Sequence, residues 1–170
     1  MAHEYRRFAI AAALLAAVGC ASPTAPDAIA GPAGIPPAAI VVTSTVLERT
    51  NAERARAGLP PLRESTQLQR AAQLHSEQMG AAARMDHVIP DAPYPNPVDR
   101  LAAAHYPWQA YGENIAMGQS GGAEVVSAWM QSAGHRANIL NPKFTELGVG
   151  VAVDHAGRPY YAQVFGRPSS

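Results

Sequence analysis

Apolar residues recur at three- and four-residue spacing in the first half of the chain, and this pattern predicts helices. One helix is expected from about residue 42 to the glycine and prolines at 58–61, and a second over residues 65–83. A short third helix is expected over 96–104, because Asn96-Pro97 is typical of a capped helix start. The inward face of the second helix carries Leu68, Ala71, Ala72, His75 and Met79.

The second half of the chain predicts one more helix and then strands. Residues 123–132 form the helix, while residues 148–153 and 160–165 alternate as two strands of an antiparallel hairpin. The apolar residues 115–117 are too few to assign to either class. Helices followed by a terminal hairpin indicate an α+β fold.

The N-terminal segment has the pattern of an export signal. Two arginines precede an apolar run over residues 8–18, which is too short to span a bilayer as a helix. Leu14-Leu15-Ala16-Ala17-Val18-Gly19-Cys20 resembles a bacterial lipobox. We therefore expect a signal peptide over residues 1–19 and lipid attachment at Cys20. An ordinary secretory signal, with a cysteine near its cleavage point, is the alternative.

A stretch rich in proline, alanine and glycine follows over residues 20–39, and this composition predicts a tether. The folded domain is then expected over residues 40–167. One cysteine cannot form an internal disulfide, so this domain depends on packing. The 13 basic and 13 acidic residues balance without a basic stripe, which argues against a nucleic-acid partner.

Three polar residues stand out as candidate chemistry. His75 lies on the inward helix face, Glu113 sits between a glycine and an asparagine, and His135 follows Gly134 just past a predicted helix end. Two imidazoles and a carboxylate could ligate Zn²⁺ or another divalent cation, or they could form a hydrogen-bonded network without metal. Each could instead act separately, as a core histidine, a loop carboxylate and a helix cap. His87 is expected in a surface loop.

Six phrases in order resemble the CAP superfamily of cysteine-rich secretory, antigen 5 and pathogenesis-related class 1 proteins, with the bacterial branch as the nearer match. They are Asn51-Ala52-Glu53-Arg54 with Gly58-Leu59-Pro60-Pro61-Leu62, His75-Ser76-Glu77-Gln78-Met79, Gly112-Glu113-Asn114-Ile115-Ala116, residues 129–140, Phe144-Thr145-Glu146-Leu147-Gly148-Val149-Gly150, and Gln163-Val164-Phe165-Gly166.

The resemblance implies a three-layer α-β-α sandwich with a small antiparallel central sheet. It also implies a cleft with two histidines and two glutamates, in which some members bind a divalent metal. By position His75, Glu113 and His135 would line that cleft together with Asn114, while Ser132 stands where the second glutamate would fall.

Our functional hypothesis is an exported, lipid-anchored domain of the cell envelope without enzymatic activity. It would bind a small apolar ligand, such as a lipid or sterol-like molecule, or an envelope partner through the cleft. The alternative is a metal-dependent, peptidase-like hydrolase with His75 and His135 as ligands and Glu113 as base.

Overall fold

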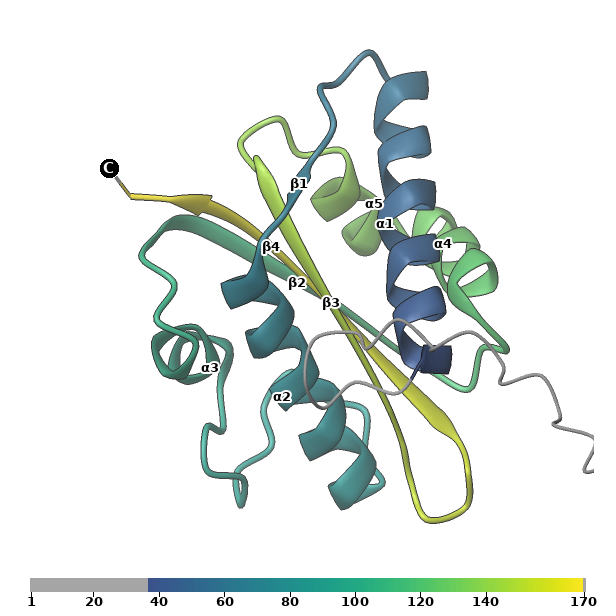
Figure 1. Cartoon of the computed structure of the whole chain (residues 1–170), viewed down its shortest axis with the longest axis vertical. Helices are drawn as coiled ribbons and strands as arrows, with labels where there is room; N and C mark the ends of the chain where they lie inside the picture. The colour runs from purple at the N-terminus through teal and green to yellow at the C-terminus, as the bar shows by residue number, and fades with distance from the viewer. Residues whose placement is uncertain (1–36, 170) are drawn as a thin grey trace, which may run out of the picture. The chain divides into compact units, whose positions relative to one another are not determined.

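A computed structural model of the chain describes residues 37–169 (Figure 1). The expected signal peptide and Cys20 lie outside these residues. None of the described helices is long and apolar enough to cross a membrane. The elements in chain order are α1 (Pro37–Arg56), β1 (Arg63–Glu64), α2 (Thr66–Ala82), α3 (Pro97–Ala103), β2 (Trp108–Met117), α4 (Gly122–Gln131), α5 (Ala133–Ile139), β3 (Glu146–Val153) and β4 (Pro159–Pro168).

The four strands form one sheet in the order β1-β3-β4-β2. β3 and β4 make the predicted antiparallel hairpin, and β2 pairs antiparallel with β4 along almost its whole length. The two-residue strand β1 pairs parallel with β3 and makes the sheet mixed. The strand β2 is therefore an edge strand, open on the side away from β4.

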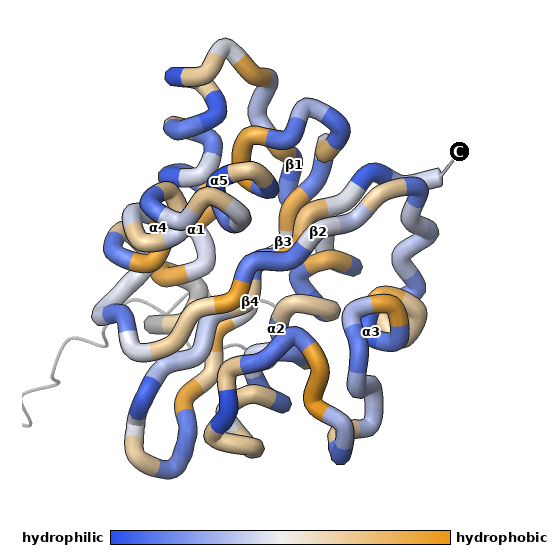
Figure 2. The backbone as a smooth tube through the Cα atoms, turned by 180° about the vertical axis from the view of Figure 1, so that it is seen from behind, coloured by the Kyte–Doolittle hydropathy of each residue, from blue (hydrophilic) through white to orange (hydrophobic). Residues whose placement is uncertain are grey.

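Helices cover both faces of this sheet, as the predicted three-layer sandwich requires. One apolar cluster joins the sheet to α2 and α3, and a second joins it to α1, α4 and α5. Figure 1 shows α2 and α3 on one side of the strands and the other three helices on the opposite side. In Figure 2 hydrophobic segments occur on β3 and β4 and also on helices of both layers.

The glycines of β3 let α2 lie directly on the sheet. A Cβ added at Gly148 would stand 2.0 Å from the carbonyl carbon of Leu68, and one at Gly150 would stand 2.3 Å from that of Ala72. At both positions a Cβ atom would overlap the backbone of α2, so only glycine fits there. This close contact brings the inward face of α2 within reach of the central strands.

Local signals set the helix starts that position the site. The side chain of Ser65 accepts a hydrogen bond from the backbone N–H of Leu68 at the start of α2, and Asn96 does the same for Asp99 at α3. Both starts agree with the sequence analysis.

Three elements differ from expectation. α1 begins at Pro37, so the last three residues assigned to the tether belong to a helix. Residues 115–117 are the end of the ten-residue strand β2. A short helix, α5, follows α4 directly, so His135 lies inside a helix and not just past a helix end.

Candidate functional site

Glu113 is the centre of a buried polar cluster between β2, α2 and α3. Its side chain is 4% exposed. The carboxylate oxygen Oε1 lies 2.8 Å from Nδ1 of His87 and 3.4 Å from Nε2 of His75. The guanidinium of Arg100 donates from Nη2 to both carboxylate oxygens, over 3.2 and 3.1 Å. Three side chains that are far apart in sequence thus meet at one carboxylate.

Arg100 also ties the segment 84–96 to the domain. This arginine is 1% exposed, and it donates to the backbone carbonyls of Tyr94, Pro95 and His87. The guanidinium suits this role, because its N–H donors are fixed in one plane and can bind several oxygen atoms at once. The position of His87 therefore depends on Arg100 as well as on Glu113.

His75 lies on the inward face of α2, as the sequence predicts, and is fully buried. Within the described structure neither of its ring nitrogens forms a hydrogen bond. Burial lowers its pKa to about 4, against the opposing attraction of the Glu113 carboxylate. The ring is neutral at pH 7.

His87 is a site residue that sequence analysis did not connect with Glu113. Its segment is a loop, as expected, but its ring is only half exposed and contacts Glu113. The hydrogen bond with Glu113 raises the pKa of His87 above the ordinary value, and burial acts in the opposite direction. No local pattern marks this residue, since its partner lies 26 positions further along the chain.

The carboxylate of Glu113 stays ionised despite its burial. Burial pushes its pKa upward, but the hydrogen bond with His87 and the nearby charge of Arg100 lower it by more. The cluster at neutral pH thus holds one buried anion, one buried cation and an imidazole that is readily protonated.

Asn114, the next residue of β2, points to the opposite face of the sheet because side chains alternate along a strand. Its side chain is fully buried and does not line an open cleft, contrary to expectation. Its Nδ2 donates to Oε1 of Gln163 and to the carbonyl of His135, each over 3.1 Å. Asn138 donates to its Oδ1 over 2.9 Å. Gln163 donates in turn to the hydroxyl of Thr50.

His135 reaches the site from α5. Only its carbonyl contacts Asn114, while its ring is partly exposed. Burial and, secondly, the positive charge of His87 lower the pKa of His135. Ser132, at the junction of α4 and α5, is partly exposed, and its side chain does not cap α5.

The predicted residues do not fit a three-ligand metal site. Within residues 37–169 no group of three or more His, Cys, Asp or Glu side chains is arranged to hold a metal ion. Glu113 already faces the cationic guanidinium of Arg100, which would repel a dication. The buried ring of His75 is also closed to solvent.

Exposed apolar side chains gather in the segment that carries His87. Seven large hydrophobic residues of the described structure are exposed, and four of them fall within residues 85–98. These four are Met85, Val88, Tyr94 and Val98. The first three lie on the loop between α2 and α3, and Val98 lies in the first turn of α3. Exposed apolar side chains that are close in sequence are more typical of a contact surface than singly scattered ones are.

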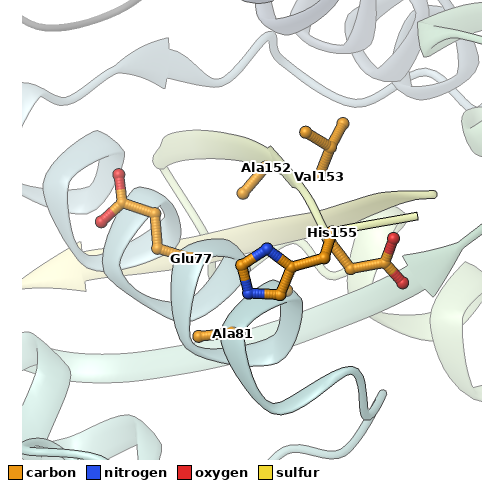
Figure 3. A pocket seen from close by; sticks show the side chains of 7 residues that line it. Glu77, Ala81, Ala152, Val153 and His155 are labelled. Carbon is orange, nitrogen blue, oxygen red and sulfur yellow. The ribbon is translucent and has the colours of Figure 1, made fainter. Parts of the chain in front are cut away.

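A separate pocket of about 430 Å³ lies between the end of α2 and the turn that joins β3 to β4 (Figure 3). Its lining includes no residue of the Glu113 cluster. Ala81 and Ala152 belong to its apolar part, and Glu77 and His155 are its flanking polar side chains in Figure 3.

Comparisons with known proteins agree on one family. The model described as "CAP: Cysteine-rich secretory protein family" matches residues 47–165. The Bacillus subtilis protein YkwD is 46% identical over 105 residues, covering 62% of this chain and 40% of that protein. The Bacillus subtilis membrane protein YlbC is 38% identical over 120 residues, covering 71% of this chain and 33% of that protein. The chain thus spans well under half the length of either relative.

A solved structure agrees with the fold. The crystal structure of an extracellular protein with an SCP domain from Bacillus anthracis has a TM-score of 0.70 and 33% sequence identity. The match covers 81% of this chain and 45% of that one.

Proposed function

The chain belongs to the CAP family of cysteine-rich secretory proteins, and we propose that it is an exported recognition domain of the cell envelope. Its binding face is centred on His87 and on the exposed apolar side chains of residues 85–98. The occupant is a small apolar ligand, such as a lipid or sterol-like molecule, or an apolar surface of an envelope partner.

The state of Glu113 carries this proposal. Its two carboxylate oxygens accept from Arg100, and one of them also contacts His87 and His75. A general base needs a free lone pair near its substrate, and a metal ligand needs an oxygen without a competing cation. This carboxylate is 4% exposed and paired with the guanidinium of Arg100, so it is neither close to a substrate nor free of a competing cation, and its role in the proposal is to hold the binding face in place.

The names of two relatives support export. One solved relative is described as extracellular, and one curated relative as a membrane protein. Attachment of lipid at Cys20, followed by a tether, would display the domain at a membrane surface. Mass spectrometry of the mature N-terminus tests this part, and a free thiol at Cys20 would contradict it.

Binding to the face is tested with residues 20–170 carrying Cys20→Ser, which lack the proposed lipid anchor, and vesicles of phosphatidylethanolamine and phosphatidylglycerol, with and without a fluorescent sterol. We expect Val88→Ser together with Tyr94→Ser to weaken binding at least tenfold, on the order of 1.4 kcal/mol. The matched control is Val41→Ser with Val153→Ser, which removes exposed apolar side chains elsewhere. Equal losses of vesicle binding in the two double variants would argue against a specific binding face.

A second candidate function, hydrolysis, is favoured by one observation. Nδ1 of His87 faces a carboxylate at 2.8 Å, an arrangement that orients an imidazole as a general base through its other nitrogen. The experiment is peptide and ester hydrolysis combined with metal analysis of the purified protein. Activity that disappears in His87→Gln but survives in His155→Gln would favour a hydrolase. Stoichiometric zinc lost on changing His75 and His135 would favour the metal-dependent form.

A further inference from the structure

Trp108 and Tyr111 form an aromatic pair at the beginning of the edge strand β2. Their ring centroids lie 4.9 Å apart and their planes meet at 79°, which is an edge-to-face contact. Trp108 is 42% exposed and Tyr111 is partly buried, whereas Trp129, the other tryptophan of the chain, is buried. Packing of the core therefore does not account for the position of Trp108.

A β-bulge places both rings on one face of the sheet. Residues three apart in a regular strand point to opposite faces. Here Trp108 is opposite Pro168 and Tyr111 is opposite Gly166, so three steps along β2 match two steps along β4 (Figure 1). The extra residue of the bulge is Gln109. Because their partners in β4 are two residues apart, the two aromatic side chains share a face.

This face is the one that α2 and α3 cover. A Cβ added at Gly166 would lie 2.4 Å from the hydroxyl oxygen of Tyr106, and Tyr106 belongs to the apolar cluster of α2 and α3. Tyr111 packs against the same cluster. Glu113, two residues further along β2, points to this side as well. The aromatic pair thus lies on the same side of the sheet as the Glu113 network, at the beginning of the strand.

Both rings carry a polar group that has no partner within residues 37–169. Neither the indole N–H of Trp108 nor the hydroxyl of Tyr111 forms a hydrogen bond there. By contrast, the indole N–H of Trp129 donates to the carbonyl of Ile115 over 3.0 Å. The hydroxyls of the buried tyrosines all donate to protein oxygens as well, and these tyrosines are Tyr106, Tyr160 and Tyr161. The pair therefore offers aromatic surface together with one N–H and one hydroxyl.

A ligand that fits this pair has an apolar face and a polar edge. A hydrocarbon chain would cover the N–H and the hydroxyl without bonding to them, which costs free energy. A pyranose ring with equatorial hydroxyls presents C–H groups on its faces, and their slight positive charge suits the negative face of an aromatic ring. Its hydroxyls can bond to the two polar groups and to the amide of Gln109, which is exposed beside them. Residues 104–112 contain no acidic side chain, which argues against a cationic ligand.

We propose that Trp108 and Tyr111 form a carbohydrate-binding site for β-linked pyranose chains. One sugar ring stacks on the exposed indole of Trp108, and its hydroxyls bond to Tyr111 and Gln109. This inference goes beyond the proposed binding of an apolar ligand and does not depend on it.

The experiment is an NMR titration of residues 20–170 carrying Cys20→Ser with cellotriose and with triacetylchitotriose. The two indole N–H signals distinguish the site from the rest of the protein. With at least one of these sugars the Trp108 signal should shift until binding saturates, while the signal of Trp129, which is bonded to Ile115, should stay in place. Sucrose, which contains no β-linked pyranose chain, is the control ligand and should move neither signal. An equal shift with sucrose, a shift of both indole signals, or no shift with either trisaccharide would overturn the inference.

Three variants identify the groups that bind the sugar, with affinities measured by saturation-transfer NMR. Trp108→Ala removes the stacking surface and should weaken binding about tenfold. Tyr111→Phe keeps the ring, removes the hydroxyl and should weaken binding about threefold. Val153→Ala is the control, because it removes exposed apolar surface from another strand and should leave the affinity unchanged.

The same variants separate a sugar site from a contact with a membrane. If Trp108→Ala weakens vesicle binding but leaves the affinity for both trisaccharides unchanged, the aromatic pair contacts lipid and the inference is wrong. If Trp108→Ala does not fold, Tyr111→Phe and the indole signals of the unchanged protein still decide. The titration contains no lipid, so a failure of vesicle binding would contradict the proposed function and leave the sugar site standing.

Discussion

Two buried polar networks lie back to back on strand β2 and differ in charge. On the α2–α3 side, Glu113 faces Arg100, His87 and His75. On the α5 side, Asn114 joins a chain of neutral amides and a hydroxyl that ends at Thr50. The adjacent residues Glu113 and Asn114 thus belong to a charged network and a neutral network.

This difference in charge determines which of the two networks can respond to pH. Amides and hydroxyls do not titrate near neutral pH, so the Asn114 network can specify only packing and register. The Glu113 network holds two histidines whose pKa values shift in opposite directions, one of them reached by solvent. We therefore assign recognition to the Glu113 side and structure to the Asn114 side.

The largest effect should come from breaking the charged network at its buried cation. Arg100→Leu leaves the carboxylate of Glu113 buried without its guanidinium, and we expect the unfolding free energy to fall by about 3–5 kcal/mol. Urea unfolding measures this. Arg84→Leu is the control, because the ion pair of Arg84 with Asp86 is exposed and solvent screening should leave it little effect on stability. Similar costs for the two variants would contradict the assignment.

His75 should make stability depend on pH. Its pKa is about 4 in the fold and 6.5 in the reference state, so its contribution is fully present above pH 6.5 and lost as pH falls to about 4. The loss amounts to about 3 kcal/mol. Unfolding free energies at several pH values should show a shallower slope in His75→Leu than in the control His155→Leu. Parallel slopes would mean that His75 is not the group responsible.

The neutral network should respond to mutation but not to pH. Asn114→Leu leaves Gln163, Asn138 and the carbonyl of His135 short of a partner, and we expect a cost of about 1–3 kcal/mol. Chemical denaturation at pH 5 and pH 8 should give the same difference from the unchanged protein. If the loss of unfolding free energy in Asn114→Leu varies with pH as strongly as that in the His75 variant, the two networks do not differ as we propose.

The smallest effect is expected at His87. Its pKa is raised in the fold, so its contribution to stability is present below about pH 6.5 and lost as pH rises through the raised value. Because the ring is half exposed, solvent screening should keep this contribution below about 1 kcal/mol. Denaturation of His87→Gln at pH 6 and pH 9 checks the sign. A larger cost at the higher pH would show that the sign is wrong.

Two elements, β2 and α5, escaped sequence analysis for different reasons. In β2, Glu113 faces one layer and Asn114 the other, so neither face shows the apolar alternation that predicts a strand. α5 is only seven residues long and contains Gly134, and a pattern that short carries little periodic signal. Both elements hold candidate site residues.

The sequence alone determined the helical periodicity of α2 and its start near residue 65, the capped start at Asn96, the β3–β4 hairpin and the family resemblance. Each of these depends on neighbours within a few positions or on a matched phrase. Only the tertiary structure decided that His87 and Arg100 share Glu113 with His75, and that Asn114 turns away from them. Hydrogen bonds and burial between residues distant in sequence have no local pattern, because they arise only when α2, α3 and β2 are brought together.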